Sequence, residues 1–244
     1  MSSTRLPGKV MKPLAGRPML AHVVERASAA KLVDRVVVAT STDPGDDEIA
    51  RWCAASGVEC FRGSLDDVLD RYHRAARSAG AAVIVRITAD CPMLDPEIVD
   101  MLIRRFLDSG ADYAGLDGRF PDGLDCEVFT AGALECAWRK ARLRSEREHV
   151  TPFIWKNPRR FAIAHLRSER DLSQMRWTVD DERDFAFAAE VFRALGGGGG
   201  GGRIFHMRDV LALLEENPRL AEINAGTPRN EGYFKSLRED GIVS

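Results

Sequence analysis

The stretch Arg5-Leu6-Pro7-Gly8-Lys9 is the first part of this sequence whose residue types could do chemistry. Gly8 allows the backbone to approach a ligand closely, while Arg5 offers a planar guanidinium and Lys9 a point charge on either side of that approach. Together these residues predict a loop that holds a polyphosphate. The segment alone does not decide the question, because basic residues near the start of a chain are usually solvated.

Two aspartates complement this loop. Asp90 comes just after the apolar stretch 82–88, and Asp180 follows a short segment that is typical of a strand end. A carboxylate facing a polyphosphate repels it unless a cation lies between them, and Mg²⁺ is commonly held by one or two carboxylates together with phosphate oxygens. We therefore predict that Asp90 and Asp180 bind Mg²⁺. Helix capping accounts better for Asp95 and Asp181.

Alternating strands and helices position these residues. Apolar β-branched runs at 35–41, 58–61, 82–88 and 111–116 are separated by helical patterns, which predicts an α/β fold with a doubly wound, mostly parallel sheet. Ligands of such sheets bind beyond the carboxyl ends of the strands. The loops to inspect are therefore Thr40 to Asp43, Arg62-Gly63-Ser64 and Thr88 to Pro92.

The second half of the chain departs from this rhythm. A turn-rich stretch near 120 enters a strand, helices are expected near 131–141 and 145–156, and a strand end at 176–180 leads into another helix. Seven glycines, Gly196 to Gly202, predict a flexible surface linker. The residues after it are too few for a core of their own, so we expect one domain, 1–244.

The composition excludes several classes of protein. The 35 basic and 37 acidic residues nearly cancel, so no global field attracts nucleic acid or an anionic membrane surface. No apolar run approaches the ~20 residues that span a bilayer. The five cysteines form no CxxC or zinc spacing and are typical of buried thiols in a reducing compartment. We expect a soluble, cytoplasmic protein.

Six segments, in order along nearly the whole chain, resemble the motifs of the cytidylyltransferase family, which includes CMP-KDO synthetase, CMP-acylneuraminate synthetase and spore coat polysaccharide biosynthesis protein F. They are "STRLPGKVMKPLAGRPML", "FRGSLDDVLDRY", "VRITADCPMLDP", "FPDGLDCEVF", "SEREHVTP" and "RWTVDDERD". The resemblance implies a GT-A-like nucleotidyltransferase fold and a reaction in which CTP and an acidic sugar give a CMP-sugar and pyrophosphate.

The resemblance also implies roles for individual residues. Arg5, Gly8 and Lys9 match the triphosphate loop, with Lys9 steadying the leaving pyrophosphate, and Asp90 and Asp180 match the metal ligands. Nucleobase-side contacts would come from Arg62, Gly63 and Ser64. The sugar pocket would be built by Asp122, Asp125, Glu127, Arg147, Glu148 and His149. Region 119–160 would carry the dimer contact of a homodimer.

The family pattern places an interior strand and an Ala-Arg pair ahead of the first motif. The printed sequence begins after that strand, so we expect a fold without its first strand. Either the start codon lies upstream of Met1, or the strand is supplied otherwise, or the protein is impaired, and we hypothesise the first. In-frame translation of the upstream DNA tests this hypothesis.

Two other functions stay open: a sugar-1-phosphate nucleotidyltransferase, which would need further cations in the sugar pocket, and a non-catalytic nucleotide-binding relative. The pair Asp90 and Asp180 favours an enzyme, because a binding module needs no metal pair.

Overall fold

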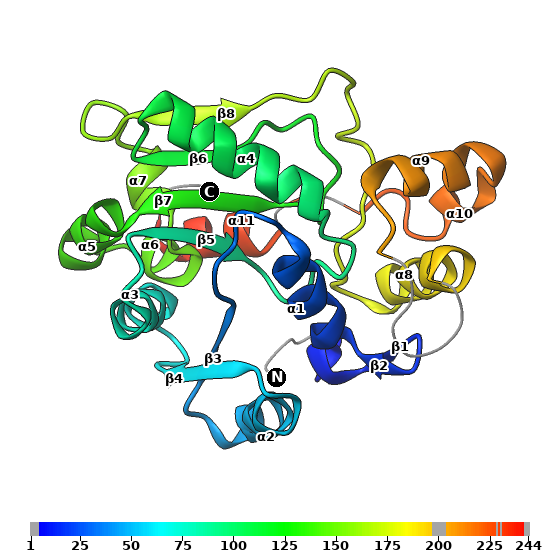
Figure 1. The fold of residues 1–244 in the computed structure, drawn as a ribbon, viewed down its shortest axis with the longest axis horizontal. Helices are drawn as coiled ribbons and strands as arrows, with labels where there is room; N and C mark the ends of the chain where they lie inside the picture. The colour runs from blue at the N-terminus through cyan, green and yellow to red at the C-terminus, as the bar shows by residue number, and fades with distance from the viewer. Residues whose placement is uncertain (1–4, 197–203, 228, 230, 242–244) are drawn as a thin grey trace.

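Short strands and amphipathic helices alternate along the chain in a computed structural model that describes residues 5–196, 204–227, 229 and 231–241. Figure 1 shows their arrangement. The strands are β1 (Pro13–Leu14), β2 (Arg17–Pro18), β3 (Val37–Ser41), β4 (Glu59–Gly63), β5 (Val83–Ile87), β6 (Tyr113–Leu116), β7 (Cys126–Thr130) and β8 (Ile163–Leu166). The helices are α1 (Met19–Ala29), α2 (Asp47–Ser56), α3 (Val68–Ala79), α4 (Pro96–Ser109), α5 (Ala131–Lys140), α6 (Arg144–His149), α7 (Pro152–Trp155), α8 (Glu182–Leu195), α9 (Met207–Glu216), α10 (Arg219–Glu222) and α11 (Glu231–Glu239).

The largest sheet has the order β5-β7-β6-β8 and is mixed. β7 runs antiparallel to both β5 and β6, whereas β6 and β8 are parallel. The α/β class is confirmed, but the prediction of a mostly parallel sheet is wrong for this part of the fold. The turn-rich segment before β7 reverses the chain, so β7 enters between two strands that precede it in the sequence.

β3 and β4 form a separate parallel pair, and β3 has no backbone pairing with β5 in the part of the chain that the structure describes. The same helices nevertheless cover both strands. Tyr72 of α3 donates a hydrogen bond from its hydroxyl to the carbonyl oxygen of Ile87 at the end of β5 (3.2 Å), while α3 also packs on β3. On the opposite face, Val36 shares a core cluster with Val85 and with α1. The two sheets are therefore parts of one layer, in which the facing edges of β3 and β5 are unpaired within the described residues.

Side chains of successive residues serve the two faces of the large sheet, as the twofold period of a strand requires. Ile84 and Phe129 pack with α3 and α5, whereas Val85 and Val128 pack with α1 and α4. The sheet is thus covered by helices on both faces, which the apolar composition of its strands predicted.

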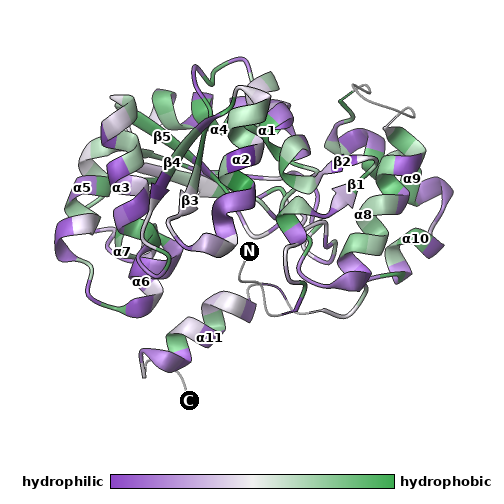
Figure 2. Cartoon of the chain, turned by 90° about the horizontal axis from the view of Figure 1, so that it is seen from below, coloured by the Kyte–Doolittle hydropathy of each residue, from purple (hydrophilic) through white to green (hydrophobic). Residues whose placement is uncertain are grey.

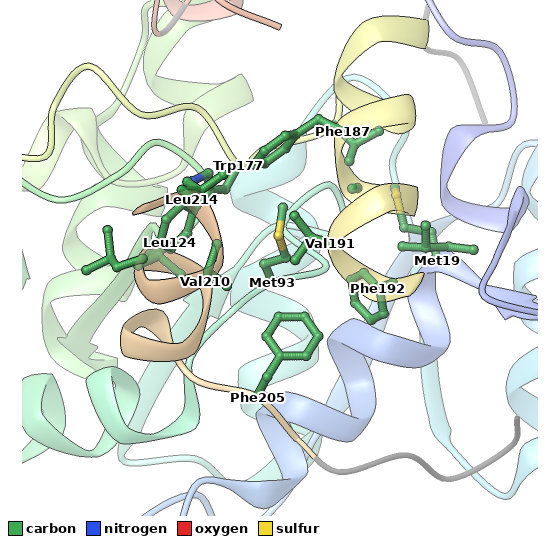
Figure 3. Packing of buried hydrophobic residues seen from close by; sticks show 14 of the residues in the cluster. Met19, Met93, Leu124, Trp177, Phe187, Val191, Phe192, Phe205, Val210 and Leu214 are labelled. Carbon is green, nitrogen blue, oxygen red and sulfur yellow. The ribbon is translucent and has the colours of Figure 1, made fainter. Parts of the chain in front are cut away.

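A third cluster supports the loops at the carboxyl ends of the strands. It joins α1, α8 and α9 with single residues from those loops, among them Met93, Leu124 and Trp177 (Figure 3). Phe205 and Val210 extend it beyond residue 204. The segment after the glycine run therefore packs back on the main body, as the sequence predicted, while the linker prediction for 197–202 lies outside the described residues.

Two local predictions are wrong. The helix expected near 145–156 is divided into α6 and α7, because Val150 adopts φ 73° and Pro152 begins a new helix. The strand end expected at 176–180 is only an isolated bridge between Asp122 and Arg176. Within the described residues, none of the helices combines the length and the apolar character needed to cross a membrane.

Candidate functional site

Lys9 connects the two aspartates that the sequence predicted as metal ligands. Its ammonium nitrogen donates to Asp90 Oδ2 at 3.0 Å, to Asp180 Oδ1 at 2.9 Å and to the carbonyl oxygen of Val179 at 2.8 Å. Asp90 and Asp180, which follow Lys9 in the sequence by 81 and 171 positions, therefore meet at its ammonium nitrogen. Two carboxylate oxygens that converge on one ammonium group form a donor set that also suits Mg²⁺.

Local backbone geometry brings these side chains together. Gly8 has φ 69°, in the left-handed region that favours glycine, and it precedes a 3₁₀ turn that begins with Lys9. Leu6 anchors the loop in the core with 2% of its surface exposed. The amide of Val179 donates to the carbonyl oxygen of Asp90 at 2.8 Å, which fixes the two acidic loops side by side.

The electrostatics match this arrangement. Burial lowers the pKa of Lys9, but the carboxylates of Asp90 and Asp180 outweigh burial and hold that pKa above its ordinary value. Burial raises the pKa of the Asp180 carboxyl, but the neighbouring cations Lys9 and Arg5 outweigh burial and hold that pKa below its ordinary value. Burial and the neighbouring carboxylate of Asp90 raise the pKa of Cys91 well above its usual range, which favours the neutral thiol.

Arg176 is a site residue that sequence reasoning missed. This buried guanidinium donates to Asp180 Oδ2 and Asp122 Oδ2, both at 2.8 Å, and to both carboxylate oxygens of Asp184 at 3.0 Å. Asp184 in turn accepts from the amide of Asp180 at 3.0 Å and from the side-chain amide of Asn224 at 2.9 Å. The sequence carried no signal for this role, because Arg176 lies in the non-helical segment before α8 and meets Asp180 and Asp184 only through the way that segment folds.

Asp122 and Asp125 lie beside this network. Asp122 is buried against Arg176, and Asp125 pairs with Arg229 at 2.8 Å. Gly123 makes the approach possible, because a Cβ there would lie 2.2 Å from the amide nitrogen of Thr178. Burial and the charge of Asp125 raise the pKa of Asp122 to about 7, against the opposing effect of the two arginines. Asp122 therefore lies on the buried side of this network, where it pairs with the guanidinium of Arg176.

Arg62, Gly63 and Ser64 lie at the carboxyl end of β4. The guanidinium of Arg62 donates to the carbonyl oxygens of Ser41 (2.8 Å) and Asp43 (3.1 Å), and it pairs with Asp47. Ser64 Oγ accepts from the amide of Asp67 at the start of α3. These residues join the loops that follow β3 and β4, at the edge where the sequence expected them.

Glu127 is the centre of a second polar cluster, on β7. Its carboxylate accepts hydrogen bonds from Arg86 on the neighbouring strand, from the hydroxyl of Tyr113 and from the hydroxyl of Thr151, each at 2.6 Å. Arg86 and Glu127 are direct cross-strand partners. Burial lowers the pKa of Arg86, but Glu127 more than compensates and raises that pKa overall. The Nε of Arg86 is buried without a partner in the described residues.

The three predicted residues on α6 point in different directions. Arg147 turns toward α3, where it pairs with Asp67 and donates to the carbonyl oxygen of Trp138. Glu148 and His149 instead turn toward α11, where Ser236 Oγ lies 2.9 Å from Glu148 Oε2 and 3.1 Å from His149 Nε2. Burial lowers the pKa of His149, which favours its neutral form. Figure 2 shows that α11 extends beyond the rest of the body.

Comparisons with known proteins identify the class that this fold and site define. The family model described as Cytidylyltransferase matches residues 1–194, so the chain belongs to the cytidylyltransferase family. Among its relatives, the spore coat polysaccharide biosynthesis protein SpsF of Bacillus subtilis is 33% identical over 91% of this chain and 93% of its own length.

Solved structures agree with this assignment. A cytidylyltransferase from Leptospira borgpetersenii superposes with a TM-score of 0.85 and 31% identity, covering 93% of this chain and 95% of that one. A CMP:2-keto-3-deoxy-manno-octonic acid synthetase complexed with CTP gives a TM-score of 0.60 at 16% identity, covering 79% of this chain and 95% of that one. The second likeness concerns the fold alone.

Proposed function

We propose that this chain is a Mg²⁺-dependent enzyme that condenses CTP with an acidic sugar to give a CMP-sugar and pyrophosphate. The observation that carries the proposal is the convergence of Asp90 and Asp180 on Lys9 Nζ, at 3.0 and 2.9 Å. The relationship to spore coat polysaccharide biosynthesis protein SpsF supports a role in making a surface polysaccharide.

In the proposed mechanism, positioning and charge do most of the work. Asp90 and Asp180 would hold Mg²⁺, which neutralises phosphate oxygens and lowers the pKa of the sugar hydroxyl that attacks the α-phosphorus. Arg5 and Lys9 would bind the β- and γ-phosphates and stabilise the charge that grows on the departing pyrophosphate. Arg62, Gly63 and Ser64 would line the nucleobase side. No side chain of the protein needs to form a covalent intermediate.

The acceptor sugar would bind near Glu127, with Glu148 and His149 at the rim. A phosphate acceptor carries more negative charge than a carboxylate and would need more unpaired cations in this region. Among the described residues, Arg86 already pairs with Glu127, Arg147 with Asp67, and Arg229 with Asp125, so these cations offer little uncompensated positive charge to a dianionic group.

Two measurements test the proposal. Calorimetric titration with CTP should show binding that strengthens when Mg²⁺ is present, and pyrophosphate should be released only when an acidic sugar is added. Release with a sugar 1-phosphate, but not with an acidic sugar, would support the alternative nucleotidyltransferase. Binding of CTP without turnover of any sugar would support the non-catalytic relative.

We also propose that one additional strand belongs between β3 and β5, as expected of a fold without its first strand. Two observations support this position: the facing edges of β3 and β5 have no backbone partner among the described residues, and α1 and α3 pack near both strands. Amide hydrogen exchange tests it: extending the chain before residue 1 with an apolar strand should slow exchange in β3 and β5, and an extension of the same length in glycine and serine should not. Equal exchange in both would contradict it.

A further inference from the structure

Three cations surround the two aspartates that we propose as metal ligands. Lys9 bridges Asp90 and Asp180, while Arg176 and Arg5 approach the second oxygen of Asp180 at 2.8 and 3.3 Å. Both oxygens of Asp180 are therefore already engaged by positive charge. A metal ion that uses this carboxylate must share it with these side chains or replace one of them.

The cations differ in how firmly they are held. Arg176 is 8% exposed, and Asp122 and Asp184 also fix its guanidinium. Lys9 is attached differently, because its ammonium group bonds only to the two aspartates and to one carbonyl oxygen within the described residues, at the end of a flexible side chain. The side chain of Arg5 is 40% exposed. Arg176 is thus held by three carboxylates, whereas Lys9 is held at the site by the two aspartates and one carbonyl oxygen, and Arg5 pairs with Asp180 and with Glu231 of α11.

The distances make Lys9 and a metal ion competitors. Mg²⁺ binds carboxylate oxygens at about 2.0–2.1 Å. An ion at that distance from Asp90 Oδ2 and Asp180 Oδ1 would lie no more than about 5 Å from Nζ of Lys9, because the oxygens themselves lie 3.0 and 2.9 Å from Nζ. Charges of one and two units repel strongly at this distance in a partly buried site.

We propose that Lys9 is an exchangeable internal cation: it occupies the aspartate pair when no metal is bound, a divalent cation competes with it for the two carboxylates, and a bound triphosphate accepts the displaced ammonium group. Nucleotide and metal then bind cooperatively, because the phosphates offer the displaced ammonium group of Lys9 a new negatively charged partner. Arg176 remains and keeps Asp180 oriented. This inference rests on the proposed function, because it takes Asp90 and Asp180 to be the metal ligands.

The binding of Mn²⁺ in the absence of nucleotide tests the exchange. Electron paramagnetic resonance measures this binding as the loss of the signal of the free ion. Lys9→Met removes the charge while keeping most of the length of the side chain, and it should bind Mn²⁺ at least about tenfold more tightly than the unmodified protein. Lys12→Met is the matched control, because Lys12 pairs with the exposed Glu182, and it should match the unmodified protein. Equal or weaker Mn²⁺ binding by a folded Lys9→Met variant would overturn the proposal.

Labelling of lysines in the unmodified protein gives a second test that needs no variant. Saturating Mg²⁺ alone should release Lys9 and raise its rate of acetylation several-fold, as read by mass spectrometry, while Lys12 stays constant. An unchanged rate at Lys9 would contradict the exchange. Asp90→Asn separates this outcome from a failure of the proposed function: if Mn²⁺ binding is unaffected in Asp90→Asn, the metal pair itself is wrong.

Discussion

The cation end of the proposed site, around Asp90 and Asp180, and its proposed acceptor end, around Glu127 and His149, are built in different ways. At the cation end, short loops from distant parts of the chain meet through charged side chains, and a core cluster lies beneath them. At the proposed acceptor end, the carboxylate of Glu127 on β7 accepts three hydrogen bonds, and α11 packs at the periphery through hydrogen bonds of Ser236, an ion pair between Arg144 and Glu239, and ring contacts of Tyr233. The first arrangement suits a reaction common to a family, and the second can vary with the substrate.

The largest expected effect lies at the cation end. Asp180→Asn removes the charge that Lys9 and Arg176 share, so pyrophosphate release at saturating CTP and sugar should fall by about 10³-fold or more. Asp181→Asn is the control: Asp181 caps α8 by accepting from the amides of Arg183 and Asp184, and the amide side chain can still accept. If the Asp180→Asn variant released pyrophosphate at a rate within tenfold of the unmodified enzyme, this would argue against Asp180 as a metal ligand.

The second prediction concerns the pH dependence of stability at the same end. The pKa of Asp122 is raised to about 7 in the folded protein, from 3.8 when unfolded, so the folded state binds the extra proton between these values. Through this group, the free energy of unfolding should therefore be greatest below about pH 4 and should fall as the pH rises toward 7. Denaturation of Asp122→Asn across this range should lack that component, and an identical pH profile would refute the assignment.

Glu127→Gln should have a smaller effect, at the acceptor end. The amide cannot balance the buried charge of Arg86, so unfolding should become easier by about 2–4 kcal/mol, and the KM for the sugar should rise more than the KM for CTP. Urea denaturation and steady-state kinetics measure the two effects. Glu148→Gln, which changes a more exposed carboxylate, serves as the control. Its free energy of unfolding should stay within about 0.5 kcal/mol of that of the unmodified protein. A larger change in the KM for CTP would place Glu127 on the nucleotide side.

The smallest expected effect is the release of α11 by acid. Because the pKa of His149 is lowered in the folded protein, its neutral form contributes stability above about pH 6.5, and that contribution is lost as the pH falls below this value. Protonation should loosen the contacts of His149 with Ser236 and Tyr233, worth about 1 kcal/mol. Fluorescence of Trp155, which packs against Tyr233, should report the change, and His149→Gln should abolish its pH dependence.

These two titrations sharpen the comparison, because they have opposite signs. Acid favours the folded state through Asp122 and disfavours it through His149. If both ends lost stability together as the pH fell, the site would behave as one unit and the distinction between its ends would be wrong.

Much of the fold and of the cation end could be predicted from sequence. The positions of β3, β4 and β5, and the acidic loop after β5, follow from apolar periodicity and from where ligands bind in such sheets. Arg176 and Asp184 could not be predicted as partners of Asp180, because their roles depend on how the segment 176–184 folds against Asp122. The antiparallel entry of β7 was missed for a similar reason, since strand order is set by pairing across the sheet.

The sequence alone determined which chemical groups are available: a glycine-lysine loop, aspartates after apolar segments, and the family to which these motifs belong. Tertiary structure decided which of those groups meet. Lys9 bonds to carboxylates 81 and 171 positions away, and Arg147, Glu148 and His149, adjacent in sequence, turn to different neighbours. The physical reason is that local patterns report the direction of a side chain relative to its own element, whereas charge pairing depends on which elements pack together.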